Sequence, residues 1–411
     1  MISRWKIFSI TFSIVLVFFS FNLKSQTANE AFNRGFQLMT TENYSLAIDQ
    51  FTEAIEIVPH FYEAYFERGR SFQYLDMHQK AISDFSNAIG YNQDFWDAYY
   101  YRAISFSALG EHDKALKDYN QAVSKKPESV DAYLKRSEIY IRNSANNDAI
   151  EDLTKVIGLG HRNANVYLNR GKLLLQQNEA DSALADFNKG IELDPDHVEL
   201  RTERALVAIK LEEYDAAAID LSVAIDEGVH TQAIFQQRAD ALFSAERYNA
   251  AIEDYTILIN TYRQRNEETY YKRALSYFYA QEYEAAVRDF TRVIGLNRNN
   301  EQAYIHRAEG YHYLERDSQA LVDYRIILRI NPRNTEAYLK RAEMLMKDGK
   351  YKEALEDFDQ LIRLEPTADA YYKRAALHAL MGNRKYACDD LRQAISMGHE
   401  EAEKRAAEFC L

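Results

Sequence analysis

The sequence lacks the short motifs that mark most catalytic and metal sites. None of C-x-x-C, H-E-x-x-H, G-x-S-x-G, a phosphate-binding P-loop or G-x-G-x-x-G is present, and the ten histidines are scattered rather than spaced as metal ligands. His306 and His312 lie six residues apart, a spacing that places them on different faces of a helix. The sequence therefore favours a protein that is not an enzyme, and it implies no metal and no cofactor.

Clusters of lysine and arginine are also lacking. The formal net charge is −13, and removal of an N-terminal segment that carries three cations (Arg4, Lys6 and Lys24) and no acid would make it −16. An acidic surface repels phosphate backbones, so the charge excludes nucleic acid as an expected ligand. Direct binding to anionic lipid is not expected either.

The N-terminal hydrophobic run is too short to span a bilayer comfortably. Residues 1–25 have a basic start (Arg4, Lys6), an apolar run over residues 7–21 and a short polar tail. A membrane-spanning helix needs about 20 apolar residues, and the pattern is typical of a secretory signal peptide cleaved after Ser25. We therefore expect an exported protein: periplasmic, associated with the outer membrane or secreted. The alternative is an uncleaved membrane anchor.

Arginine recurs at a fixed interval through the rest of the chain. Seven arginines in a row are 34 residues apart, and the spacing then resumes with one residue added and later one removed: Arg34, Arg68, Arg102, Arg136, Arg170, Arg204, Arg238, Arg273, Arg307, Arg341 and Arg374. A period in this range marks a solenoid of stacked units. Residues 28–401 divide into eleven units: 28–61, 62–95, 96–129, 130–163, 164–197, 198–231, 232–266, 267–300, 301–334, 335–367 and 368–401.

Other residue types keep the same register. The residue after each arginine is always Gly, Ala or Ser, and alanine always stands thirteen positions after the arginine. All five prolines share one register just beyond the second apolar stretch, where they cannot continue a helix. Apolar residues spaced i, i+4, i+7 occur twice in each unit, as in Tyr304, Ala308 and Tyr311. Each unit is therefore predicted to form two amphipathic helices in a tight hairpin.

The residue types at these repeated positions resemble those of the tetratricopeptide repeat. The matching residues of the tenth unit are Tyr338, Ala342, Leu345, Tyr351, Ala354, Phe358, Leu361 and Pro366. The resemblance implies an all-α fold, a right-handed α-solenoid of stacked antiparallel helix hairpins, and a scaffold that binds a protein or peptide on the concave face lined by the first helices. The alternative is a structural component of an envelope or outer-membrane assembly, docked by its convex face or edges. The sequence does not fix the oligomeric state.

The arginine column departs from the family pattern, which usually has an apolar residue there. Sixteen positions after the arginine, ten of the eleven units carry Asp, and Gln50 is the exception. Residues equidistant from the turn of a hairpin lie at the same height, so we predict an arginine–aspartate ladder inside the stack. The alternative is a row of arginines that grips an anionic ligand.

Aromatic residues in the exposed registers of the first helices are the candidates for binding. The predicted peptide-binding groove in units 7 to 9 contains Phe243, Tyr271, Phe278, Tyr279 and Tyr313. A second candidate set contains Phe66, Tyr100 and Tyr101. Tyrosine supplies contact area at a modest entropic cost, but tyrosine is abundant throughout this chain, and the alternative is that these side chains fill the seams between helices. The lysine and asparagine pattern that grips C-terminal carboxylates in some members of the family is absent.

The two cysteines lie close to the C-terminus. Cys388 and Cys410 are equidistant from a turn near His399, so antiparallel helices would bring them level. We predict a disulfide that fastens a C-terminal capping helix over residues 402–411; the alternative is two buried thiols. The residue added near Asn266 predicts an interruption of the stack.

Overall fold

The computed structural model describes residues 24–410, and every regular element in that range is an α-helix. The chain divides into two compact units, the first ending at Leu200 and the second beginning at Arg201. The predicted signal peptide, residues 1–25, lies outside the described residues except for its last two positions, which are helical. No helix among the described residues is long and apolar enough to cross a membrane.

The first unit contains five helix hairpins. It starts with a helix that covers residues 24–40. The following helices are α2 (Tyr44–Ile57), α3 (Tyr62–Tyr74), α4 (His78–Tyr91), α5 (Trp96–Ala108), α6 (His112–Lys125), α7 (Val130–Arg142), α8 (Asn146–Gly158), α9 (Ala164–Gln176) and α10 (Ala180–Leu193). From α3 to α9, each first helix packs on the second helix of its own hairpin and on the second helix of the preceding hairpin.

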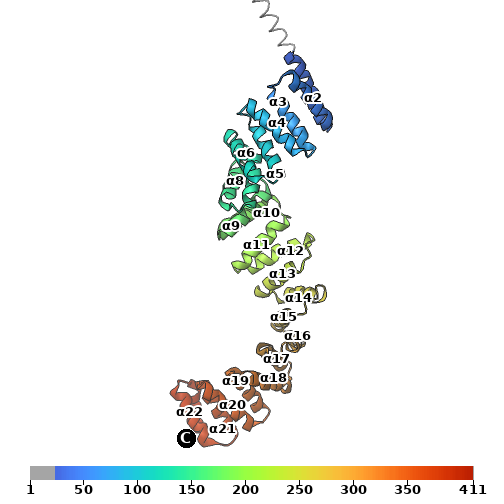
Figure 1. Cartoon of the computed structure of the whole chain (residues 1–411). Coiled ribbons are helices and arrows are strands. Elements are labelled where there is room, and N and C mark those ends of the chain that lie inside the picture. The colour runs from blue at the N-terminus through green and yellow to red at the C-terminus, as the bar shows by residue number, and fades with distance from the viewer. Residues whose placement is uncertain (1–23, 411) are drawn as a thin grey trace, which may run out of the picture. The chain divides into compact units, whose positions relative to one another are not determined.

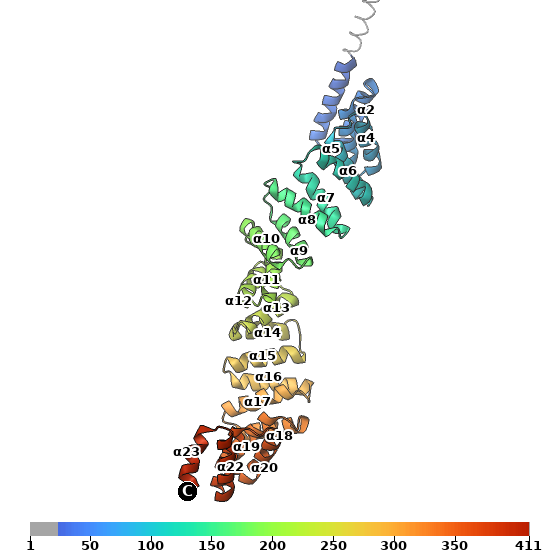
Figure 2. The ribbon, with the colours of Figure 1, turned by 90° about the vertical axis from the view of Figure 1, so that its left-hand side faces the viewer.

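The second unit contains six hairpins and a final helix. Its elements are α11 (Val198–Lys210), which crosses the boundary, then α12 (Tyr214–Asp226), α13 (Gln232–Ser244), α14 (Tyr248–Asn260), α15 (Glu267–Tyr279), α16 (Tyr283–Leu296), α17 (Glu301–Tyr313), α18 (Asp317–Ile330), α19 (Thr335–Lys347), α20 (Tyr351–Leu364), α21 (Ala368–Leu380), α22 (Arg384–Ser396) and α23 (Glu400–Phe409). The hairpins of each unit follow one another in chain order as a stack (Figure 1, Figure 2). The stacks confirm the predicted all-α solenoid.

A residue with left-handed backbone closes every hairpin, eight positions after the arginine. The backbone amides of this residue and of the residue after it donate hydrogen bonds to carbonyl groups of the first helix. For example, Asp76 N donates to Gln73 O at 3.0 Å, and Met77 N donates to Phe72 O at 2.8 Å. Such a helix end favours glycine. Glycine is present in only three hairpins, for example Gly349 (φ 73°), whereas most hairpins have another residue there, such as Glu246 (φ 61°).

The arginine–aspartate ladder is present in the ten hairpins that contain the aspartate. Arg238 is typical: its Nε and Nη2 donate to the two carboxylate oxygens of Asp254 at 2.8 and 2.7 Å. Its Nη1 donates to Ser222 of the preceding hairpin at 3.1 Å. Each such arginine therefore joins the two helices of its own hairpin, and most also reach the hairpin before. In the first hairpin Arg34 meets Gln50 at 2.6 Å instead.

The stack continues through the loop near Asn266, so the predicted interruption is wrong. The extra residue is absorbed by a loop over residues 261–265, in which Arg263 has a φ of 56°. Asn266 then caps α15 by accepting a hydrogen bond from the Thr269 amide at 2.9 Å. Helix α14 packs directly against α15.

The C-terminal end is covered by α23. A disulfide joins Cys388 on α22 to Cys410, as predicted. Ala402 is buried, and the His399 ring stacks on Tyr372 with 4.3 Å between centroids. Helix α23 thus covers apolar side chains that the last hairpin would otherwise leave open.

Candidate protein-binding surface

The first helices of the second unit place four of the five predicted groove residues in one connected group. Phe243 at the end of α13 lies 6.4 Å from Tyr279 at the end of α15, measured between ring centroids. Phe278 lies 5.8 Å from Tyr279 and 5.9 Å from Tyr313, which ends α17. Tyr271 lies nearer the start of α15 and makes none of these ring contacts.

Two tyrosines outside the predicted groove complete this group. Tyr248 and Tyr283 begin the second helices α14 and α16. Tyr248 stacks on Tyr279 with 5.1 Å between centroids, and Tyr283 stacks on Tyr313 at 4.6 Å and 13°. We call the six residues the aromatic face: Phe243, Tyr248, Phe278, Tyr279, Tyr283 and Tyr313.

The stacked pairs follow a pattern that the sequence does contain. A tyrosine at the first position of a second helix meets a tyrosine at the last position of the next first helix. The first unit has the same arrangement in Tyr44 and Tyr74, whose rings stack at 4.6 Å and 12°. In the sequence, each stacked pair is two tyrosines 30 or 31 residues apart. This spacing can be interpreted only once the ends of the helices are known.

The aromatic face offers surface as well as packing. Tyr279 is 48% exposed and Tyr313 is 58% exposed, while Phe243 and Phe278 are half-buried beneath them. Each exposed ring is fixed by a stacked tyrosine behind it, so little freedom remains to be lost when a partner binds. The arrangement can present two rigid rings with hydroxyl groups, one from each of two neighbouring hairpins.

Tyr271 and the second candidate set belong mainly to seams between hairpins. Tyr271 packs against Phe290 and His306, with centroids 5.8 and 6.2 Å away. Phe66 is only 7% exposed and lies in the core beside Phe85, so its prediction as a groove residue is wrong. Residues two positions before the arginine point toward the next hairpin, which explains why an aromatic there is covered.

Tyr100 and Tyr101 are also partly buried. Tyr100 packs on Tyr119 at 6.0 Å, and burial raises the pKa of Tyr100 to about 12. Tyr101 lies under the Arg70 guanidinium, whose carbon is 5.1 Å from the ring centroid. These two tyrosines hold neighbouring helices together.

Ion pairs link successive first helices next to the aromatic face. Lys272 on α15 reaches back to Asp240 on α13 at 2.9 Å, and Lys373 on α21 reaches back to Glu343 on α19 at 2.6 Å. In each pair, the lysine stands one position before the arginine of its own hairpin, and the acidic residue stands two positions after the arginine of the preceding hairpin. This repeated pairing was not predicted from the sequence.

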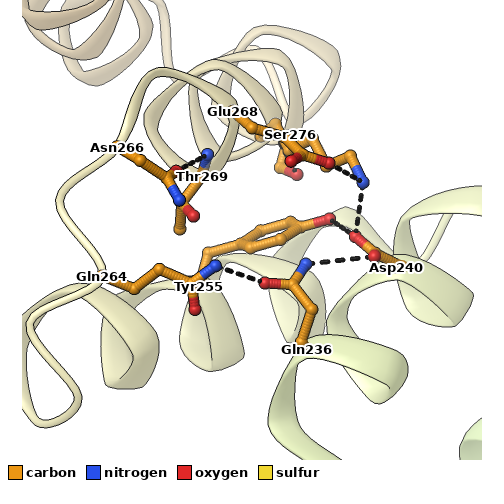
Figure 3. Close-up of polar contacts among 9 residues, drawn as sticks. Gln236, Asp240, Tyr255, Gln264, Asn266, Glu268, Thr269 and Ser276 are labelled. Carbon is orange, nitrogen blue, oxygen red and sulfur yellow. Dashed lines mark hydrogen bonds and ion pairs between the residues drawn. The ribbon is translucent and has the colours of Figure 1, made fainter. Parts of the chain in front are cut away.

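Asp240 is the centre of a larger network, shown in Figure 3. Its Oδ1 accepts hydrogen bonds from the Tyr255 hydroxyl at 2.7 Å and from Lys272 at 2.9 Å, and its Oδ2 accepts one from Gln236 at 3.0 Å. Gln264 in the long loop donates to Gln236 at 2.9 Å. Burial and the charge of Asp240 raise the pKa of Tyr255, so its hydroxyl stays protonated.

A pocket of about 210 Å³ opens two hairpins further along, between α17 and α19. Its lining consists of Glu309, His312, Tyr313, Tyr324, Lys340, Glu343, Met344 and Lys347. The exposed ring of Tyr313 therefore belongs both to the aromatic face and to the pocket wall.

The described residues contain no group of His, Cys, Asp and Glu side chains arranged to hold a metal ion. His306 lies beside Glu309 at 3.2 Å, and His312 lies beside Asp317 at 2.8 Å. Each of these histidines thus has its own carboxylate, and the two do not form a joint site.

Comparison with protein families gives matches in both compact units. The family model described as tetratricopeptide repeat matches residues 96–129 and 164–197, which are the third and fifth of the eleven sequence repeats. The model described as ETO1 C-terminal domain matches residues 230–406. No significant match was found among curated proteins.

Several solved structures are similar at low identity. The C-terminal part of a TPR repeat-containing protein from Cytophaga hutchinsonii is 18% identical over 58% of this chain and 98% of that one, with a TM-score of 0.47. A tetratricopeptide repeat protein from Parabacteroides merdae is 20% identical over 60% and 98%, with a TM-score of 0.37. YrrB, described as a TPR protein with an unusual peptide-binding site, is 16% identical over 62% and 97%, with a TM-score of 0.29.

The family matches agree with the fold. Helix hairpins recur at the arginine period in both units, with small residues where the two helices cross and alanine where they pack. The chain is a tetratricopeptide-repeat protein.

Proposed function

We propose that this chain is a non-enzymatic scaffold that binds a protein or peptide through the concave side of its second unit, in the cell envelope. The observation that carries the proposal is the aromatic face. Its two exposed tyrosines, Tyr279 and Tyr313, stand at equivalent places on neighbouring first helices.

The physical case rests on what such rings contribute to binding. Tyrosine is enriched among the residues that dominate interface energies, because a large ring is buried while its hydroxyl keeps a hydrogen bond. Tyr279 and Tyr313 are already stacked on Tyr248 and Tyr283, so they resemble the preformed anchors of a rigid paratope. The ion pairs Lys272–Asp240 and Lys373–Glu343 supply a polar surrounding.

Two features support an envelope location. Residues 1–25 have the composition of a secretory signal. The Cys388–Cys410 disulfide is of a kind that persists mainly in oxidising compartments.

A second candidate function is a structural part of an envelope assembly, docked by the convex side. It is favoured by exposed apolar side chains on second helices. Ile219 on α12 is 63% exposed, and Val322, in the same register on α18, is also exposed. A docked partner would cover such residues.

Crosslinked affinity capture from envelope extract tests the proposal. We expect Tyr279→Ala/Tyr313→Ala to lose the captured partner, since the variant removes both exposed rings. The matched control is Tyr44→Ala, which removes a ring of the same stacked type from the first unit and should retain the partner.

Equal folding is checked by circular dichroism before the capture. A partner that the double variant keeps would move the interface elsewhere. Loss only in Ile219→Ser/Val322→Ser would favour the structural role.

A further inference from the structure

Tyrosine replaces phenylalanine at one buried position of the second helix in three hairpins, two of which lie in the second unit. Seventeen positions after the arginine, five hairpins carry phenylalanine: Phe51, Phe85, Phe187, Phe290 and Phe358. Tyr255 and Tyr324 occupy this position with 0% and 3% exposure. A buried hydroxyl needs a hydrogen-bond partner, so each of these tyrosines requires something that phenylalanine does not.

Tyr255 finds its partner inside the chain. Its hydroxyl and the Lys272 ammonium both donate to Oδ1 of Asp240, at 2.7 and 2.9 Å (Figure 3). At this site, a tyrosine hydroxyl and a lysine ammonium in these registers together bind one carboxylate oxygen.

The same registers recur at the pocket between α17 and α19. Tyr324 corresponds to Tyr255, Lys340 to Lys272 and Glu309 to Asp240. Here the carboxylate has a different partner, because Glu309 Oε2 lies 3.2 Å from the Nδ1 atom of His306. Within residues 24–410, neither the Tyr324 hydroxyl nor the Lys340 ammonium has a hydrogen-bond or ion-pair partner.

The other charged groups of the pocket are already paired. Glu343 accepts from Lys373 at 2.6 Å, and Lys347 donates to Asp317 at 2.9 Å. Burial raises the pKa of Tyr324, with the charge of Glu309 adding to the effect, so the hydroxyl remains a donor at neutral pH. The Tyr324 hydroxyl and the Lys340 ammonium are therefore donors of the pocket that no side chain among residues 24–410 occupies.

We propose that this pocket binds the carboxylate of an aspartate or glutamate side chain in the partner protein, with Tyr324 and Lys340 as the donors. The inference rests on the proposed function, and it assigns a chemical preference to one part of that surface. The partner's carboxylate takes the place that Asp240 occupies in the closed site. Tyr313 and Met344 line the pocket beside it and can contact the apolar stem of the bound side chain.

Glu309 makes the proposal sharper because its negative charge opposes an incoming carboxylate. If the pocket binds an anion, Glu309→Gln must strengthen binding. If Lys340 instead closes onto Glu309 in solution, as Lys272 does onto Asp240, the pocket is filled from within and takes no ligand.

The experiment is an NMR titration of the full chain carrying tyrosine labelled with ¹³C at the hydroxyl-bearing carbon. The Tyr324 signal is assigned from Tyr324→Phe, which should fold because phenylalanine is the common residue at this position. The probe is N-acetylglutamate α-methylamide, and its neutral counterpart is N-acetylglutamine α-methylamide. N-acetylglycine represents a carboxylate at a chain end.

We expect a saturable shift of the Tyr324 signal with the glutamate probe and none with the glutamine probe. Lys340→Gln should weaken the binding about tenfold, the usual size of one hydrogen bond to a charged group. Lys272→Gln is the matched control, and it should leave the Tyr324 titration unchanged. Glu309→Gln should strengthen the binding.

Three results overturn the inference: no shift of the Tyr324 signal with the glutamate probe, equal shifts with the glutamine probe, or tighter binding of N-acetylglycine, which would assign the site to chain ends. Each of them leaves the proposed function standing, because the capture experiment depends on Tyr279 and Tyr313 and not on this titration. Loss of the aromatic face as an interface would conversely leave the carboxylate titration intact.

Discussion

The arginine–aspartate ladder makes a quantitative prediction at Arg238. The change Arg238→Met keeps most of the apolar stem and removes three hydrogen bonds, two to Asp254 and one to Ser222. Asp254 is 0% exposed, so its carboxylate is left without its partner in a buried place. Breaking one side of a buried pair costs about 3 to 5 kcal/mol, and we expect a loss of that size in the second unit.

A compensating variant separates the lost partner from lost packing. Arg238→Met/Asp254→Leu replaces both members by apolar side chains of similar length, and it should recover most of the stability because no charge is left buried. Arg34→Met is the matched control. Its side chain meets Gln50 and the half-exposed Glu53, so the change should cost no more than about 1 kcal/mol.

The assay is chemical denaturation followed by circular dichroism, together with hydrogen exchange resolved to α13 and α14. Repeat proteins can open hairpin by hairpin, so exchange should rise first in this hairpin. Unchanged melting and exchange in Arg238→Met would show that the ladder does not hold the hairpins together. An equal loss of stability in Arg34→Met would show that the introduced methionine, and not the broken ion pair, causes the effect.

Three further changes test the end, the turns and the polar network. Cys410→Ser removes the disulfide and should lower the stability of the C-terminal end by about 3 kcal/mol, with faster exchange in α23; unchanged exchange would contradict this. Gly349→Ala should cost about 1 kcal/mol because φ is 73°, whereas Gly90→Ala, inside a helix with open space around it, should stabilise by about 0.5 kcal/mol; the same sign for both in denaturation curves would refute the backbone argument. Tyr255→Phe removes one donor to Asp240 and should cost about 1 kcal/mol in the same assay, and no change would show that this hydrogen bond does not contribute.

The period of the sequence predicted the fold because the packing inside a hairpin depends on fixed separations along one chain. The small residue after the arginine and the residue seventeen positions after the arginine meet in the three hairpins that have glycine and phenylalanine there: a Cβ on Gly35, Gly69 or Gly171 would lie 2.7, 2.8 or 2.5 Å from the facing ring. The arginine and the aspartate are equidistant from the turn, so their pairing also followed from spacing alone. Contacts of this kind need no knowledge of how one hairpin sits on the next.

The binding surface could be predicted only in part, because it depends on packing between hairpins. Phe66 and Tyr271 precede the arginine by two positions and are covered by the next hairpin, whereas Tyr279 and Tyr313 follow it by six positions and remain exposed. Composition does not separate these two registers. The stacking tyrosines and the Lys272–Asp240 pair also cross between hairpins, and the sequence carried no signal strong enough to identify them beforehand.

The most direct test of the central claim is photo-crosslinking in the cell envelope with benzoylphenylalanine at position 313. The account predicts that this replacement of Tyr313 forms a crosslink to a partner protein, while the same replacement of Tyr74, which holds the equivalent position in the first unit, does not. A crosslink from Tyr74 and none from Tyr313 would contradict it, because the interface would then lie outside the aromatic face.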